Sequence, residues 1–228
     1  MFKHAFYCYI FFSSIAFSQW IDLDISGSQG ERFEIETLPL FRGLSSSISA
    51  SDIHFPSNRH RSYFGYTLNA INATYYSGLV PSAKASISPS RNLALDGRLS
   101  AFTSGSELMV VSGYGLRLTL LQDSQHPWFL LFNSTGMNGS LIKRVKSTQF
   151  GLHRWNTIFG IPFIAGLEYH FIRGSMLFAD NTNTKVEDKS TQIILGFSKK
   201  FGSTTILPKL SWHPSVVTIS VEMGLYIY

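Results

Sequence analysis

The sequence contains a single cysteine, Cys8, and that residue lies within the first eighteen positions. One thiol cannot form a disulfide inside its own chain, so a disulfide-stapled extracellular module is excluded. The chain that follows position 18 also has no cysteine at its start that could accept a lipid. This argues against a lipoprotein.

Charged residues are scarce as well. They make up 14% of the 228 residues, whereas soluble domains contain about 25%. Hydrophobic residues reach 44%, which is too many for a disordered chain. The basic cluster Lys143–Lys146 has no interleaved aromatic residues, so it indicates a solvated loop and not a nucleic-acid site. A surface with so few charges faces something other than water.

Long apolar runs and cofactor motifs are missing too. After position 18 the sequence has no run of eighteen apolar residues, which excludes transmembrane helices. It has no phosphate loop and no dinucleotide fingerprint. The histidines show no metal-ligand spacing; those considered are His54, His60, His126, His153 and His170. We therefore expect neither a metal nor a cofactor.

The N-terminus has the features of a secretory signal peptide. A short basic start precedes an apolar stretch, and the small residues Ala16 and Ser18 follow it. A membrane anchor is the alternative, but the apolar stretch is shorter than the roughly 20 residues that a span needs. Residues 1–18 are therefore predicted to be a signal peptide that is cleaved after Ser18.

The last residues, 216–228, alternate between apolar and polar side chains without interruption. Such alternation predicts a strand with one apolar face. About eleven residues at ~3.3 Å each, tilted by about 45°, rise close to the ~25 Å apolar band of a membrane barrel. Similar patterns predict further strands near 204–212, 190–200, 163–178, 147–160, 127–134, 107–121, 92–103 and 66–76.

These strands predict an all-β, antiparallel, up-and-down transmembrane barrel of about ten strands, with eight to twelve possible. The tenth strand would come from residues 20–26 or 32–38. Residues 19–62 are thus predicted to hold an N-terminal strand and an irregular Ser-rich segment, and residues 63–228 the barrel. A secreted soluble barrel or sandwich, with the apolar faces turned inward around an apolar ligand, is the alternative.

The polar faces of the strands supply candidate lumen residues. These are Asp96, Arg98, Arg117, Glu168, His170 and Glu222. Because side chains largely fill a barrel this small, we expect a hydrogen-bonded, partly ion-paired interior. A structural role is predicted, or transport through a narrow channel.

The signal peptide, the alternating strands and the aromatic C-terminal residue resemble bacterial outer-membrane β-barrel proteins. The resemblance implies insertion into the outer membrane by the barrel assembly machinery, which recognises the last strand in that class. We expect a monomer in contact with outer-membrane lipids. In that class the terminal aromatic residue is in phase with the apolar positions, whereas Tyr228 is in phase with Glu222.

One set of residues matches a catalytic arrangement. His213, Ser215 and Glu222 are similar to the His-x-Ser and Glu set of outer-membrane lipid A deacylases, so a lipid-modifying hydrolase is a further alternative. On one straight strand, however, Glu222 points to the face opposite His213 and Ser215 and lies ~23 Å from Ser215 at ~3.3 Å per residue. Pro214 places the pair in a turn. No catalysis is expected.

Counting strands backward from a periplasmic C-terminus predicts which connections lie outside. The longest polar connections, 179–189 and 135–146, would both be external, together with the turn at 213–215. Residues 199–204 and 160–162 would be short periplasmic turns. Outer-membrane barrels show this asymmetry of loop length.

Overall fold

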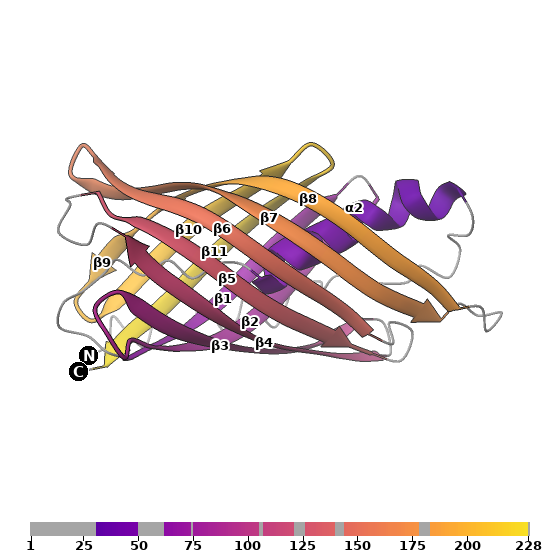
Figure 1. Cartoon of the computed structure of the whole chain (residues 1–228), viewed down its shortest axis with the longest axis horizontal. Coiled ribbons are helices and arrows are strands. Elements are labelled where there is room, and N and C mark those ends of the chain that lie inside the picture. Colours follow the sequence, from indigo (N-terminus) through magenta and orange to yellow (C-terminus); the bar gives the residue numbers. More distant parts are fainter. Residues whose placement is uncertain are drawn as a thin grey trace.

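The computed structural model describes residues 31–49, 62–73, 75–104, 107–120, 126–139, 144–177 and 183–227. These residues form one helix and a single antiparallel sheet (Figure 1). In chain order the elements are α2 Glu31–Ser49, β1 Ser62–Ala73, β2 Ser77–Ile87, β3 Leu93–Ser104, β4 Glu107–Leu120, β5 Trp128–Asn138, β6 Arg144–Ile158, β7 Ile161–Leu177, β8 Asn183–Phe197, β9 Lys199–Phe201, β10 Thr204–His213 and β11 Val216–Ile227.

The sheet closes on itself. The last strand, β11, pairs with β10 on one side and with β1 on the other, and the β1 ladder runs from Ser62↔Ile227 to Ala73↔Val216. The short strand β9 continues the line of β8, since both pair with β10. The fold is therefore a closed ten-stranded antiparallel barrel, as predicted.

The two rims of the barrel differ in what they carry. At the C-terminal rim β1 begins and β11 ends, and the β6–β7 and β9–β10 turns lie there. At the opposite, distal rim lie the turn at 214–215, the end of β5, the start of β6, the end of β7 and the start of β8. The predicted long loops are wrong, because β5 to β8 extend through most of 135–146 and 179–189. The asymmetry lies in the strands, since β6, β7 and β8 have 15, 17 and 15 residues.

Apolar side chains cover the outside of the barrel wall. Large exposed examples come from strands around the whole circumference, among them Phe64, Leu99, Tyr114, Leu167 and Ile219. Their neighbours in sequence point inward and are mostly polar and buried. The soluble alternative, with its apolar faces inward, is therefore contradicted. Among the described residues, none of the helices combines the length and the apolarity needed to cross a membrane.

The tenth strand is β2, residues 77–87, and not the predicted segment 20–26 or 32–38. Residues 20–26 lie outside the described residues. The alternation of β2 was weak because small residues, Ala83 and Ala85, occupy outward positions, and Ser82 and Lys84 point inward. Small outward residues carry little of the hydrophobic period on which a strand prediction depends.

Residues 31–49 form a helix, which corrects the prediction of a strand and an irregular segment there. A closed barrel offers no free strand edge, so a segment inside it must satisfy its own backbone, and a helix does so. Leu40, Phe41, Leu44 and Ile48 follow helical spacing and are all buried. Pro39 lies within the helix.

Candidate functional site: the helix-filled lumen

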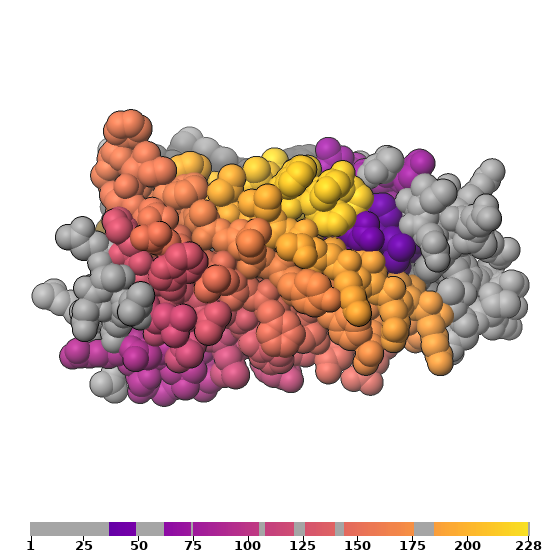
Figure 2. Space-filling view, turned by 45° about the horizontal axis from the view of Figure 1, so that its top comes forward, coloured from indigo at the N-terminus to yellow at the C-terminus, as the bar shows by residue number. Residues whose placement is uncertain are grey.

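Helix α2 lies inside the barrel, with its N-terminal part toward the distal rim (Figure 1). Arg42 bonds to Ser215 in the distal turn, whereas the carbonyl of Ile48, two turns later, accepts a bond from Arg98 midway along β3. On the face shown in Figure 2, the helix reaches the surface only near one end of the barrel. The lumen is thus occupied by a segment of the same chain.

The distal part of the lumen is apolar, and α2 fills it. Leu40, Phe41, Leu44 and Ile48 pack in one buried cluster with inward residues from nine strands. We call these inward residues the distal apolar ring: Ile71, Ala73, Val80, Phe102, Met109, Val111, Met137, Val145, Ile172, Val186 and Val216. Burial of apolar surface is worth about 25 cal/mol per Å². This contact therefore holds the helix in place.

Gly43 is the point of closest approach between helix and wall. A Cβ atom added there would lie 2.5 Å from the Cγ2 atom of Ile71 and 3.0 Å from that of Val216. Only a residue without a side chain allows α2 to lie this close to β1 and β11. The position of the helix thus depends on a glycine at residue 43.

An ion pair anchors α2 at the distal rim. The guanidinium of Arg42 donates from Nε and Nη2 to the two carboxylate oxygens of Asp188, at 2.7 and 2.9 Å. Its third nitrogen, Nη1, donates to Ser215 Oγ at 3.2 Å. Bidentate pairs of this kind fix geometry as well as charge. Arg42 therefore ties the helix to β8 and to the β10–β11 turn together.

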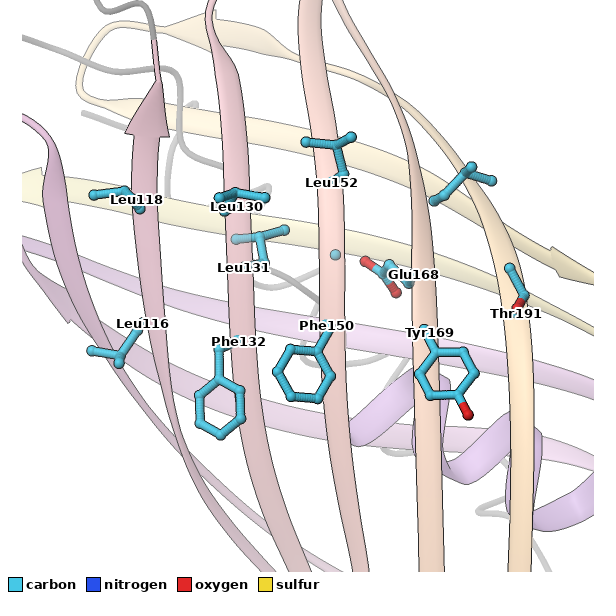
Figure 3. Close-up of a pocket in the computed structure, with 12 residues that line it drawn as sticks. Leu116, Leu118, Leu130, Leu131, Phe132, Phe150, Leu152, Glu168, Tyr169 and Thr191 are labelled. Atoms are coloured by element: carbon cyan, nitrogen blue, oxygen red, sulfur yellow. The ribbon is translucent and has the colours of Figure 1, made fainter.

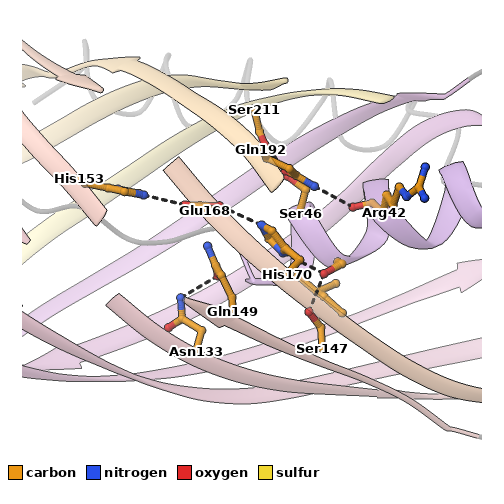
Figure 4. Close-up of polar contacts among 12 residues, drawn as sticks. Arg42, Ser46, Asn133, Ser147, Gln149, His153, Glu168, His170, Gln192 and Ser211 are labelled. Atoms are coloured by element: carbon orange, nitrogen blue, oxygen red, sulfur yellow. Dashed lines mark hydrogen bonds and ion pairs between the residues drawn. The ribbon is translucent and has the colours of Figure 1, made fainter. Parts of the chain in front are cut away.

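A polar chain crosses the middle of the lumen (Figure 4). Ser45 of α2 lies 2.5 Å from Ser147 Oγ and 3.0 Å from His170 Nδ1. His170 Nε2 in turn lies 3.2 Å from one oxygen of Glu168, and His153 Nε2 lies 3.1 Å from the other. With its proton on Nε2, His170 donates to the carboxylate, and His153 Nε2 lies at ion-pair distance from the other oxygen. The carboxylate of a fully buried glutamate is thereby satisfied.

Three further polar contacts lie beside this chain. Ser46 of α2 donates to Ser211 Oγ at 2.9 Å, and Ser211 donates to Gln192. Gln192 Nε2 donates to the Arg42 carbonyl at 3.4 Å. Figure 4 shows these residues around the helix. The serine face of α2 thus meets the polar part of the wall, and its apolar face meets the distal apolar ring.

Nearer the C-terminal rim, Glu222 forms a second ionic cluster. It pairs with Lys84 and accepts a 2.5 Å hydrogen bond from Tyr63 Oη. The Lys84 ammonium also lies 5.0 Å from the centre of the Tyr63 ring. A Cβ atom at Gly224 would lie 1.8 Å from Tyr63 Oη. Gly224 therefore provides the space for this tyrosine.

Apolar side chains fill the remaining part of the interior on this side. Phe129, Leu131, Trp155, Ile164 and Leu207 form a separate buried cluster on β5, β6, β7 and β10. Trp155 is fully buried. From rim to rim, the interior consists of a helix in an apolar ring, a polar layer and this second cluster.

The six predicted lumen residues all lie at inward positions of the wall. Asp96, Arg117, Glu168, His170 and Glu222 are buried, and Arg98 is half-buried. The structure brings Glu168 and His170 together, and Arg98 Nη1 donates to the Ile48 carbonyl at 2.6 Å. A cation at the C-terminal end of a helix also interacts favourably with the helix dipole.

The hydrolase arrangement is only partly assembled. His213 Nδ1 lies 2.9 Å from Ser215 Oγ and accepts a bond from the Ser215 backbone N–H at 3.1 Å. Glu222 is bound instead to Lys84 and Tyr63. Such a triad needs a third group that orients the base, and Glu222 does not take that place here. The pair stabilises the distal turn.

Several residues of the interior were not predicted from the sequence. Arg42 and Asp188 lie on segments interpreted as loops, and Lys84 lies on the strand that was not recognised. His153 was noted only as a scattered histidine, although its inward parity on β6 was readable. Among the described residues, no group of three or more His, Cys, Asp or Glu side chains is arranged to hold a metal ion.

Comparisons with known proteins give no family assignment. No family model matches the sequence, and a search of curated proteins finds no match. Among solved structures, the translocator domain of autotransporter NalP from Neisseria meningitidis is similar at 10% identity, with a TM-score of 0.49, covering 83% of this chain and 94% of that one. Ail, the attachment invasion locus protein of Yersinia pestis, in complex with the heparin analogue sucrose octasulfate, matches at 8% identity and a TM-score of 0.28, covering 73% and 95%.

A closed antiparallel barrel with an apolar outer wall and a polar, filled interior is the architecture of bacterial outer-membrane β-barrels. Ten strands, an even number, fit that class as well. The fold of this chain is therefore that of an outer-membrane β-barrel.

Proposed function

We propose that this protein spans the bacterial outer membrane as a barrel that its own helix α2 keeps closed, with a structural role and no catalytic one. The packing of α2 into the distal apolar ring carries this proposal. The neighbours of the barrel would be outer-membrane lipids, and β11 would be the strand that the assembly machinery handles. The protein would act as a monomer.

The outer face of β8 supports the membrane location. Lys189 and Lys199 lie at the two ends of an uncharged outward row, which consists of Thr191, Ile193, Leu195 and Phe197. Ten residues at ~3.3 Å span about 33 Å, which corresponds to a height of about 23–27 Å at a tilt of 35–45°. The apolar band of membrane barrels is about 25 Å tall. The two lysines are therefore spaced to reach the two interfaces.

Narrow transport is the second candidate, and it would require α2 to move. One observation favours it: the contact between helix and wall is divided between an apolar face and the polar residues Arg42, Ser45 and Ser46. A helix held partly by hydrogen bonds can exchange those bonds for water. Closed and open states of one barrel would then differ in the position of α2.

The membrane location is tested by washing. The full chain, expressed with residues 1–18, should remain in the outer-membrane fraction after high-salt and carbonate treatment, because its outer wall is apolar. Recovery of the protein in the soluble fraction would refute the proposed membrane location.

In planar bilayers the wild-type protein should show rare openings only, and a steadily open channel would contradict closure by α2.

The orientation is tested with two cysteine variants in a chain whose only thiol, Cys8, belongs to the predicted signal peptide. Pro214 at the distal rim and Ser203 at the C-terminal rim are both exposed turn residues. With a periplasmic C-terminus, Pro214→Cys should react with an impermeant maleimide on intact cells. Ser203→Cys should react only after lysis. The reverse pattern would invert the topology.

The absence of catalysis is tested at the distal turn. Ser215→Ala should leave any lipid deacylation or esterase signal of the purified protein at the level of the wild type. Arg42→Gln serves as the matched control, because it removes the same hydrogen bond and leaves the hydroxyl in place. A signal lost in Ser215→Ala alone would establish the hydrolase alternative.

A further inference from the structure

The cations on the outer wall are unevenly distributed. Toward the distal rim, five outward cations lie on three adjacent strands, β6 to β8. We call them the distal basic patch: Arg144, Lys146, Arg173, Lys185 and Lys189. In the described parts of β1 to β5, β10 and β11, no lysine or arginine points outward. Because β6 to β8 are the longest strands of the barrel, their distal ends gather these cations on one side of it.

Strand register brings the patch together. Lys146 lies opposite Arg173, and Arg173 opposite Glu187, across two neighbouring strand pairs. The Arg173 guanidinium lies 4.4 Å from the centre of the Phe171 ring, and the Lys189 ammonium lies 5.8 Å from it. Phe171 thus positions two cations side by side. Both remain exposed to the surroundings of the barrel.

The patch carries a surplus of positive charge. Glu187, paired with Arg173 at 3.1 Å, is the one outward carboxylate among these described positions. The adjacent Asp188 points inward and is bound to Arg42. Five cations and one anion leave a formal charge of +4. An exposed surplus of this size fits a partner with several negative charges.

Directly below the patch, the outer wall has an apolar groove of about 480 Å³. Figure 3 shows its two rows of side chains across β4 to β7. One row holds Leu118, Leu130 and Leu152, and the other holds Phe132, Phe150 and Tyr169. Tyr169 is two residues before Phe171, so the groove ends where the patch begins. A membrane places hydrocarbon chains at the level of the groove and head groups at the level of the patch.

We infer that the groove and the distal basic patch form one site for a phosphate-bearing, multiply anionic membrane lipid. Its acyl chains would lie along the leucine and phenylalanine rows, and its phosphates would lie on Arg173, Lys146 and Lys189. Guanidinium groups bind phosphate through two parallel hydrogen bonds, and ammonium groups bind it as point charges. This inference rests on the proposed membrane location.

The test is lipid binding to the full-length protein, purified in a neutral detergent and followed by native mass spectrometry. The probe is bis-phosphorylated lipid A, and dephosphorylated lipid A is the control ligand. The patch variant is Lys146→Gln, Arg173→Gln, Lys189→Gln. The matched control is Arg154→Gln, Lys199→Gln, Lys200→Gln, which removes three exposed cations near the C-terminal rim.

The patch variant should bind the phosphorylated lipid about 100-fold more weakly, since juxtamembrane lysines and arginines each contribute about 1 kcal/mol, or about fivefold. The affinity of the control variant should stay within about twofold of the wild type, because exposed charges far from the lipid contribute little. Neither variant should change binding of the dephosphorylated lipid. Equal losses in both variants, or no loss in the patch variant, would overturn the site.

Inorganic phosphate distinguishes a lipid site from an anion site. Millimolar phosphate should leave the bound lipid in place, because the groove contributes to the affinity. Displacement of the lipid by phosphate alone would overturn the inference. The carbonate wash tests the membrane location separately from the lipid site. A patch variant that stays in the membrane but no longer binds the lipid would leave the proposed membrane location intact. Loss of the wild-type protein from the membrane would refute the proposed function first.

Discussion

Phe41→Ala should release α2 from the lumen. Phe41 is fully buried between the helix and the distal apolar ring, and truncating a buried phenylalanine costs about 3–5 kcal/mol. The substitution destabilises the closed state, in which α2 is docked in the lumen, and leaves the open state unaffected. At 1.4 kcal/mol per factor of ten, the ratio of open to closed barrel should rise about 100- to 4,000-fold.

Single-channel recording in planar bilayers measures this ratio as the frequency of openings. Phe129→Ala is the matched control, because it removes the same ring from the separate apolar cluster nearer the C-terminal rim. It should lower the free energy of unfolding of the barrel without opening the lumen. If both variants open equally often, loosening of the wall explains the openings and closure by α2 is refuted.

A disulfide between helix and wall provides the reverse experiment. Ser46 Oγ and Ser211 Oγ are 2.9 Å apart, so cysteines at these positions are placed to bond. In the Phe41→Ala background, Ser46→Cys with Ser211→Cys should abolish the openings under oxidising conditions. Reductant should restore them. Openings that persist in the oxidised protein would show that current passes without movement of the helix.

Five further substitutions test the wall and the interior, each measured as a change in the free energy of unfolding in detergent or lipid. Met223→Arg, outward near the middle of β11, should cost about 2–4 kcal/mol. Ser220→Arg should also be costly, because Ser220 is buried. If Ser220→Arg is tolerated, the lumen is open and hydrated. Gly224→Ala should cost about 1–3 kcal/mol through its clash with Tyr63, and Tyr63→Ala should relieve part of that cost. Glu168→Gln should cost about 1–3 kcal/mol, because its NH2 group would replace one of the two carboxylate oxygens that the imidazole nitrogens contact. An unchanged stability would argue against these contacts.

The outer wall could be predicted from the sequence because lipid imposes a strict rule on it. Every second residue must be apolar over ten or more positions, as in β11, and the period of two is then readable in a single sequence. The rule weakens where the outward residue is small. Ala83 and Ala85 satisfy lipid without producing a clear pattern, and β2 was missed for that reason. At the distal rim, β8 becomes polar at its outward positions, Lys185, Glu187 and Lys189, and was interpreted as a loop.

The helix was unpredicted because its evidence is divided between two parts of the chain. Leu40, Phe41, Leu44 and Ile48 follow a helical period, but Ser45 to Ser47 and Gly43 interrupt it and suggest a loop. The second part is in the wall, where Val111, Ile172 and Val216 are apolar at inward positions and break the alternation. An inward apolar ring facing water would be unfavourable, so it requires a partner inside the barrel.

The outer wall cannot be that partner, since its apolar side chains face away from the lumen. The one described segment outside the wall with an apolar face is α2. Each half thus explains the other: the ring accounts for where the helix lies, and the helix accounts for why strand ends carry valine and isoleucine inward. The same division accounts for the polar layer, where Ser45 and Ser46 face Ser147, His170 and Ser211. A lumen matched to one helix on both its apolar and its polar side is built to be occupied by that helix, and any transport through it must begin with the helix leaving.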